Sequence, residues 1–209
     1  MDKRWLLPQY FYETQVPDSI LNPTYFYAKG MNYNKGGQTL PDLHKKYHLE
    51  FLVDYINEEL EKVRVSENMR FEFLKVHLMW CNKRVPNQWH PIHHHPNSYV
   101  SGIIYLTTND ARTWFSAPNQ WHPHTLRETT INPYHDQTEN SDVIEKIESE
   151  AGKMIIFPSH MPHSVDNNKS KTDRYTISFN AFPCGEYTAT PEDLTYIHLN
   201  FPEGGCAPY

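Results

Sequence analysis

The order of apolar and polar positions along the chain predicts one helix followed by a series of strands. Between residues 41 and 65, apolar residues recur at steps of three and four, with glutamate and lysine between them. These apolar residues are Leu43, Tyr47, Leu49, Leu52, Ile56, Leu60 and Val63. Such spacing is typical of a helix that buries one face, and Pro41 suits its first turn. We therefore expect one helix over residues 41–65.

From residue 70 onwards the pattern changes to that of β-strands. Segments rich in β-branched and aromatic residues alternate with turns that contain proline, glycine, asparagine or serine. The expected strands are residues 71–80, 99–107, 112–116, 153–157 and 173–182. Several strands behind a single helix indicate a mainly β fold with a flanking helix, built as a sandwich or jelly roll.

The rest of the chain lacks a clear period. Residues 1–40 are rich in aromatics, proline and asparagine, and we expect an irregular arm with short strands. Residues 117–150 are polar and interrupt the strands, as a long functional loop or insertion does. A chain of 209 residues suits one domain. The expected layout is one domain over 1–209, with an arm (1–40), a helix (41–65), a β core (70–182, insertion 117–150) and a tail (183–209).

Charge and cysteine content exclude several classes of protein. The formal net charge is −6 and lysine and arginine are scattered, so nucleic acid is an unlikely partner. No apolar stretch approaches the roughly 18 residues of a membrane span, and the start of the chain does not read as a signal peptide. Three scattered cysteines, Cys81, Cys184 and Cys206, do not form a disulfide framework. A cytoplasmic location is the default expectation.

Histidine is the residue type that suggests chemistry. The chain has 13 histidines, three of them consecutive in Trp89-His-Pro-Ile-His-His-His-Pro-Asn-Ser98. On an extended segment, residues two apart point to the same side, so His93 and His95 could reach one ion while His94 points away. His163, in Phe157-Pro-Ser-His-Met-Pro-His-Ser-Val165, follows another expected strand. Neutral imidazoles suit iron, zinc, copper or nickel, so these three residues are the candidate metal ligands.

A single histidine is more often a surface or core residue than a ligand. The paired spacing, together with a distant partner flanked by proline and serine, is what favours the metal interpretation. His90, His122, His124 and His160 remain as substitutes or as neighbours of the ligands.

Arg174 is the second chemical signal. It opens Arg174-Tyr-Thr-Ile-Ser-Phe-Asn180, where alternation places Arg174 and Thr176 on one face. An arginine that points into a small barrel costs several kcal/mol unless it meets an anion. Two interpretations stay open from the residues alone. Arg174 either lies on the outer surface, or binds a carboxylate in bidentate fashion with the Thr176 hydroxyl assisting.

Three segments resemble a known family. They are His90 to Leu106, Gly152 to Val165 and Asp173 to Asn180, which in this order are similar to the 2-oxoglutarate/Fe(II) oxygenases found in phages and marine bacteria. The resemblance covers about residues 76–182. It implies a double-stranded β-helix, a cupin-like jelly roll, with Fe(II) at its open end and 2-oxoglutarate as cosubstrate.

The same resemblance implies roles for individual residues. His93 and His163 match the proximal and distal iron ligands, and Arg174 matches the arginine that binds the far carboxylate of 2-oxoglutarate. Tyr105 stands where prolyl-hydroxylase-like members place a tyrosine hydroxyl on that carboxylate. Thr176 completes a variant of the arginine-x-serine pair that grips the cosubstrate in many relatives.

The sequence departs from the family at His95. The usual ligand set is two histidines and one carboxylate, which stands two residues after the first histidine. Three interpretations follow. His95 is itself a ligand, which we prefer; His95 swings away and leaves a water or anion on the metal; or Asn97 supplies a weak oxygen ligand.

The functional hypothesis is an Fe(II)/2-oxoglutarate-dependent oxygenase that hydroxylates an unactivated C–H bond of a small-molecule or peptide substrate. The insertion at 117–150 is the candidate lid, and Trp80, Trp89, Trp114 and Trp121 are candidates for the apolar wall. Two alternatives remain. One is a three-histidine cupin-type dioxygenase or isomerase that does not use 2-oxoglutarate, and the other is a non-enzymatic, metal-stabilised jelly-roll binding protein. The oligomeric state stays open, and the aromatic-rich arm (1–40) and the tail at 200–209 are the candidates for a homodimer interface.

Overall fold

The protein folds as two antiparallel β-sheets with helices on one side. The computed structural model describes residues 1–6, 9–96, 98–116, 143–188 and 196–199. The strands of this part are β1 (Asp2–Leu6), β2 (Gln9–Gln15), β3 (Phe71–Arg84), β4 (His90–His93), β5 (Val100–Tyr105), β6 (Asn109–Ser116), β7 (Val143–Ser149), β8 (Lys153–Pro158), β9 (His163–Val165), β10 (Arg174–Thr188) and β11 (Tyr196–Leu199). Its helices are α1 (Asp18–Gly30), α2 (Leu43–Lys46) and α3 (Glu50–Ser66).

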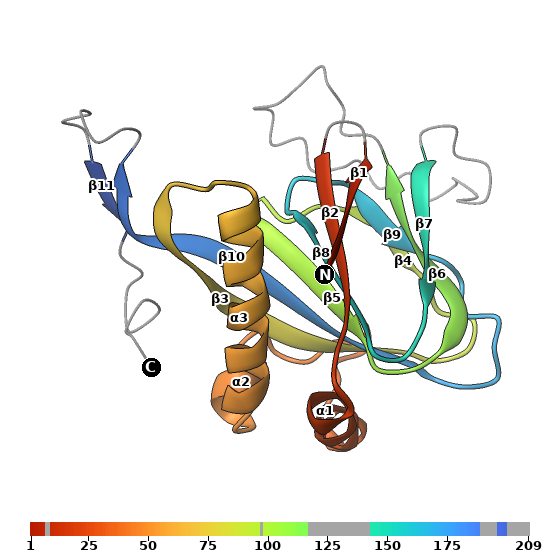
Figure 1. The fold of residues 1–209 in the computed structure, drawn as a ribbon. Coiled ribbons are helices and arrows are strands. Elements are labelled where there is room, and N and C mark those ends of the chain that lie inside the picture. Colours follow the sequence, from red (N-terminus) through yellow and green to blue (C-terminus); the bar gives the residue numbers. More distant parts are fainter. Residues whose placement is uncertain (7–8, 97, 117–142, 189–195, 200–209) are drawn as a thin grey trace.

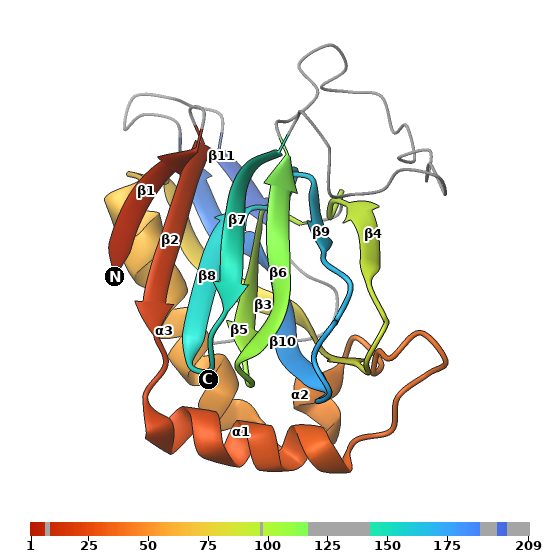
Figure 2. The same cartoon turned by 90° about the vertical axis from the view of Figure 1, so that its right-hand side faces the viewer.

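The larger sheet runs β1-β2-β8-β5-β10, and β10 continues the sheet through β3 along most of its length and through β11 at its far end. The smaller sheet has the order β4-β9-β6-β7. Figure 2 shows the smaller sheet lying face to face with the larger one, and Figure 1 shows α3 across the opposite face of the larger sheet. This arrangement is the expected jelly roll with a flanking helix.

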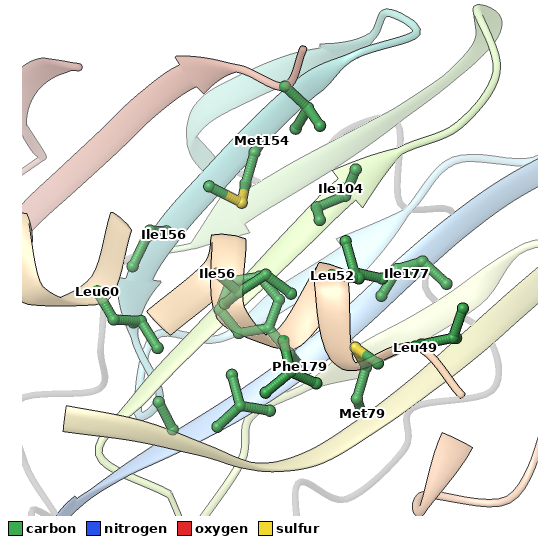
Figure 3. Packing of buried hydrophobic residues seen from close by; sticks show 14 of the residues in the cluster. Leu49, Leu52, Ile56, Leu60, Met79, Ile104, Met154, Ile156, Ile177 and Phe179 are labelled. Atoms are coloured by element: carbon green, nitrogen blue, oxygen red, sulfur yellow. The ribbon is translucent and has the colours of Figure 1, made fainter. Parts of the chain in front are cut away.

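Strand alternation divides the core into two apolar layers. Along β8, Met154 and Ile156 pack under the helices, whereas Ile155 and Phe157 pack between the two sheets. Figure 3 shows the helix side of this core, where Ile56 of α3 lies over the larger sheet. Because β8 is covered on both faces, it is apolar at nearly every position, as buried strands are.

The single helix expected over residues 41–65 is two helices. α2 ends at Lys46 and α3 begins at Glu50, and between them His48 has a positive φ of 52°. A left-handed residue cannot continue a right-handed helix. The apolar stripe survives the break, because Leu43 and Leu49 are as deeply buried as Leu52. Pro41 lies before α2, and its carbonyl accepts a hydrogen bond from the Met79 amide at 2.9 Å.

The arm expected to be irregular is largely regular. β1 and β2 pair with each other, and β2 extends the larger sheet through β8, with Tyr12 opposite Ile156. Residues 18–30 form α1, which the sequence pattern did not reveal. Pro23 lies inside this helix and no side chain caps its N-terminus. Both features mask the local signals by which a helix is found in a sequence.

Two other boundaries differ from expectation. The last part of the expected insertion is β7, which pairs with β6, while residues 117–142 and their candidate lid residues lie outside the described part of the chain. β10 continues into the expected tail as far as Thr188. Among the described residues, no helix is both long and apolar enough to cross a membrane.

Candidate active site

A pocket lies between the two sheets, and polar side chains from several strands converge on it. Its lining comes mainly from β4 and β9 of the smaller sheet and from β3, β5, β8 and β10 of the larger sheet. Three histidines (His93, His95 and His163) and two arginines (Arg84 and Arg174) are part of this lining.

The three predicted metal ligands lie together. One ring nitrogen from each of His93, His95 and His163 falls within 4.8 Å of the others. The ring centroid of His93 is 4.2 Å from that of His163, and that of His95 is 5.2 Å from both. It is the only such group of histidine, cysteine or acidic residues found in the described part of the chain.

Strand pairing and one loop contact bring these side chains together. His93 and His163 are cross-strand partners in the β4–β9 pair. His95 lies beyond the end of β4, so strand alternation does not place it. Instead its backbone amide donates a 2.9 Å hydrogen bond to the carbonyl of Ser159, in the loop that precedes His163.

Hydrogen bonds orient two of the rings for metal binding. His93 Nδ1 lies 2.9 Å from the Pro91 carbonyl, and His163 Nδ1 lies 3.1 Å from the Met161 carbonyl. A carbonyl oxygen only accepts, so each Nδ1 carries the proton and each Nε2 keeps a free lone pair. Metal-binding histidines commonly donate the other ring N–H to a backbone carbonyl in this way. Burial lowers the pKa of both rings and holds them neutral, as a ligand must be. The cluster therefore fits a divalent transition metal.

Arg174 points inward, which excludes the surface interpretation. Its side chain is 2% exposed, and its guanidinium lies 5.3 Å from the ring centroid of Tyr105. Nε donates to Ser149 Oγ and Nη2 donates to Thr113 Oγ1, each at 3.2 Å. Burial lowers the pKa of Arg174 to about 10. The described residues offer it no carboxylate within ion-pair distance.

Tyr105 and Thr176 occupy different places around this arginine. Tyr105 is fully buried, and its hydroxyl donates to Thr113 Oγ1 at 2.8 Å rather than facing the pocket. Thr176 lines the pocket on the strand that carries Arg174. Thr113 thus accepts from both Tyr105 and Arg174, which occupies both lone pairs of its hydroxyl oxygen and leaves its O–H to donate elsewhere.

The middle of the chain matches one protein family. Residues 78–180 fit the family described as "Putative 2OG-Fe(II) oxygenase". The chain belongs to the 2-oxoglutarate/Fe(II) oxygenases. Members of this family depend on Fe(II) and 2-oxoglutarate, so the oxygenase prediction and both predicted cofactors are confirmed. Comparison with curated protein sequences gives no match.

Solved structures show the same fold at low identity. HygX of Streptomyces hygroscopicus, with nickel, 2-oxoglutarate and hygromycin B bound, aligns with a TM-score of 0.63 at 12% identity, over 83% of this chain and 82% of HygX. A Pseudomonas putida prolyl-4-hydroxylase aligns with a TM-score of 0.57 at 11% identity, over 84% and 93%. The viral collagen prolyl hydroxylase of Paramecium bursaria Chlorella virus-1 aligns with a TM-score of 0.54 at 13% identity, over 87% of this chain and 94% of the hydroxylase. These likenesses establish the double-stranded β-helix fold.

In this oxygenase two other described histidines near the cluster in sequence, His94 and His160, stay out of the pocket lining. His94 does not line the pocket, and His160 is exposed. His122, His124 and the alternative ligand Asn97 lie outside the described residues.

His90 lines the pocket but is bonded in a way that prevents it from binding metal. Arg84 Nη2 lies 2.9 Å from His90 Nδ1, and a guanidinium has only donors. His90 Nδ1 is therefore the acceptor and the ring proton sits on Nε2. Burial lowers the pKa of His90 to about 3, so the ring stays neutral. With one nitrogen accepting and the other protonated, neither has a lone pair for an ion.

Of the tryptophans proposed for an apolar wall, Trp80 has the expected position. It lines the pocket, and its ring lies 5.5 Å from that of His95. Trp89 is 46% exposed, and Trp114 is buried away from the pocket, between Arg112 and Lys146. Trp121 lies outside the described residues.

Three residues in or behind the oxygenase pocket were not found in the sequence. Thr113 and Ser149 contact Arg174 from the smaller sheet, and Arg84 pairs with His90, which the sequence had named as a possible neighbour of the ligands. Thr113 and Ser149 give no sequence signal, because their role depends on which sheet faces Arg174. Arg84 gives a weak sequence signal, because it ends a long alternating strand on the face that lines the pocket.

Proposed function

We propose that the protein hydroxylates an unactivated C–H bond of a small-molecule or peptide substrate, with His93, His95 and His163 as the iron ligands and Arg174 as the cosubstrate anchor. One observation carries the assignment of residues. A cluster of three neutral imidazoles, with His163 buried and the other two half-buried, shares a pocket with a buried arginine for which the described residues offer no carboxylate. A metal ion and a dianionic ligand together complete this arrangement.

The protein's part in this chemistry is to hold, orient and shield. When bound, Fe(II) with 2-oxoglutarate and O2 supplies the oxidising power that breaks the C–H bond. The carbonyls of Pro91 and Met161 keep two imidazoles turned with Nε2 toward the shared point. Trp80 and Phe157 close the pocket with apolar surface, which limits the access of water.

The far carboxylate of 2-oxoglutarate is the natural counter-ion for Arg174. An arginine binds a carboxylate through two parallel hydrogen bonds, and burial strengthens them. The free O–H of Thr113 can donate to the same carboxylate, and Thr176 lies on the same face of β10. Tyr105 then contributes through Thr113, which its hydroxyl holds in place.

His95 gives the iron a neutral ligand where most relatives supply a carboxylate. Two features support it as a ligand. Its ring lies at the same distance from His93 as from His163, and its backbone is fixed to Ser159. Burial lowers the pKa of His95 to about 3, which keeps its lone pair available. The metal then carries one positive charge more than with the usual ligand set.

Further proposals concern the class of substrate, the cellular compartment, and the domain organisation and assembly of the protein. HygX has been solved with hygromycin B bound, which supports a small-molecule substrate here. The net charge of −6 argues against nucleic acid, and the buried thiols of Cys81 and Cys184 agree with a reducing cytoplasm. We also propose that the chain is one domain over 1–209, and that the arm at 1–40 could join two copies in a homodimer.

The test is anaerobic addition of Fe(II) and then 2-oxoglutarate to metal-free protein, followed by visible absorption. We expect the weak charge-transfer band of a chelated 2-oxo acid. Arg174→Gln should weaken 2-oxoglutarate binding by about 10- to 100-fold, the value of a charged hydrogen-bond pair. Arg70→Gln is the matched control, because Arg70 is exposed. Arg174→Lys, which keeps the charge, should recover part of the affinity.

Two outcomes would contradict the proposal. Iron binding without any band would favour a three-histidine cupin-type dioxygenase or isomerase. A closed tetrahedral zinc site without turnover would favour a metal-stabilised binding protein.

A further inference from the structure

The pocket contains a second buried arginine that the cosubstrate does not require. Arg84 is 4% exposed and is the cross-strand partner of Arg174 in the β3–β10 pair. These are the only buried arginines among the residues that the structure describes. Neither forms an ion pair in that part of the chain, whereas Arg64 and Arg112 each pair with a carboxylate.

Arg84 is held rigidly by neutral groups. Its Nη1 donates to the carbonyls of Gly36, Gly37 and Lys83, at 2.5, 3.2 and 3.3 Å, and its Nη2 donates to His90 Nδ1 at 2.9 Å. Gly37 makes this possible with a positive φ of 71°, since a side chain there would overlap with Lys83 and Arg84. The Nε–H and the second Nη2 proton of Arg84 have no partner among the described residues.

His90 adds a donor beside this guanidinium. Because its Nδ1 accepts from Arg84, its Nε2 carries the proton. Its ring centroid is 4.5 Å from that of His93, so this donor lies next to the histidine cluster. A short β-bulge between His90 and His93 lets both side chains line the pocket despite their odd spacing.

The charges in the pocket do not balance with 2-oxoglutarate alone. Two guanidinium groups and a divalent metal with three neutral ligands carry four positive charges, and 2-oxoglutarate neutralises two. In most relatives a carboxylate ligand reduces the excess, but here that position is His95. An uncompensated buried charge costs several kcal/mol, so a further anion is favoured.

We propose that Arg84 and His90 form a second oxyanion subsite, which binds a carboxylate of the prime substrate beside the metal. This inference rests on the proposed function, because it assumes that Arg174 takes the cosubstrate. Arg84 offers its Nε–H and Nη2–H edge to the oxyanion, and His90, whose Nδ1 accepts the other Nη2–H, holds the guanidinium in position. Gln38 and Asn82, joined by a 3.2 Å hydrogen bond, line the polar side of the pocket next to it. The substrate is thereby assigned to the acidic small molecules or the acidic side chains of peptides.

The experiment uses trifluoroacetate as a carboxylate probe and trifluoroacetamide as its neutral match. Fluorine relaxation is measured with Mn(II)-loaded protein saturated with 2-oxoglutarate, and with Zn(II)-loaded protein as the diamagnetic reference. We expect Mn(II) to broaden the fluorine signal of trifluoroacetate but not that of trifluoroacetamide. Arg84→Gln should weaken its binding by at least about tenfold, as loss of a charged hydrogen bond does, and Arg70→Gln should not.

His90→Phe, which leaves Arg84 in place, is the second variant and should weaken the probe by a smaller factor. Equal broadening by wild type and Arg84→Gln, or none in wild type, would refute the subsite. Displacement of the probe by 2-oxoglutarate would also refute it, because Arg84 would then serve the cosubstrate. If wild-type protein loaded anaerobically with Fe(II) and 2-oxoglutarate shows no charge-transfer band, the proposed function itself is contradicted. If that band forms but trifluoroacetate does not bind, only the subsite is contradicted.

Discussion

His93 and His163 are direct cross-strand partners, and their ring centroids lie 4.2 Å apart although 70 positions separate them in the sequence. The β4–β9 register therefore holds two donors of the candidate metal site together before any ion binds. The third donor, His95, depends on one backbone hydrogen bond to Ser159. Strand pairing therefore positions two of the candidate ligands, and a loop contact positions the third.

Removal of any ligand should weaken metal binding. We expect His93→Ala, His95→Ala and His163→Ala each to lower Mn(II) or Fe(II) affinity by at least about 100-fold. Loss of a residue that only hydrogen-bonds to a ligand already lowers metal affinity by up to about 100-fold. His94→Ala is the control, because His94 lies outside the pocket. Competition with a chromophoric chelator measures the affinities.

His95 has a second, more specific test. His95→Asp restores the usual two-histidine, one-carboxylate set and should bind metal at least as tightly as wild type. If His95→Ala binds metal as well as wild type does, His95 is not a ligand, and a water or anion takes its place.

Thr113→Val should lower 2-oxoglutarate affinity without unfolding the protein. The substitution is close in shape, but it removes the hydroxyl that accepts from Tyr105 and Arg174. Each buried donor left without its acceptor costs about 1–3 kcal/mol in stability. An anaerobic titration followed by the charge-transfer band should show at least a several-fold loss. Tyr105→Phe should cause a smaller loss, and an equal or larger one would mean that Tyr105 contacts the cosubstrate directly.

The metal-free protein should lose stability as pH falls. Burial lowers the pKa of His90 and His95 to about 3, and lowers that of His163 as well, whereas an unfolded histidine titrates near 6.5. Between these values the unfolded chain binds protons that the folded chain does not. In that range, each such histidine lowers the free energy of unfolding by about 1.4 kcal/mol for every unit by which the pH falls.

Urea unfolding between about pH 7 and about pH 5 measures this slope. His95→Gln should make the slope shallower by one proton. A slope that is the same in wild type and His95→Gln would show that His95 does not stay neutral in the fold.

Gly102→Ala should destabilise the core. Gly102 is the cross-strand partner of Phe179, and a Cβ at this position would overlap with the Phe179 ring. Overpacking of this kind costs about 1–3 kcal/mol. Gly30→Ala is the control, because no atom lies within 4 Å of a Cβ added there. Phe179→Leu should lessen the penalty of Gly102→Ala in a double-mutant cycle, and strictly additive effects would contradict the overlap.

Local pattern was enough to predict most of the strands. The alternation in β3 and β10 and the nearly continuous apolar runs of β5 and β8 follow from which faces are buried, and this is a property of neighbouring residues. The break at His48 was not predicted, because the apolar stripe continues across it. The helix α1 was missed because Pro23 masks its signal.

The candidate site divides in the same way. His93, His95, His163 and Arg174 could be found because spacing and residue type are visible in the sequence, and the family resemblance gave them roles. Thr113 and Ser149 could not, since they reach Arg174 across the gap between two sheets.

Residue type and short-range period were enough to predict the β-rich fold class, the candidate metal-binding histidines and the family. In contrast, the sequence did not predict that Arg84 faces the same pocket as Arg174, or that His90 presents N–H rather than a lone pair. Both depend on strand register and on a bulge in β4. Register is set by contacts between segments far apart in the chain, so no local pattern encodes it.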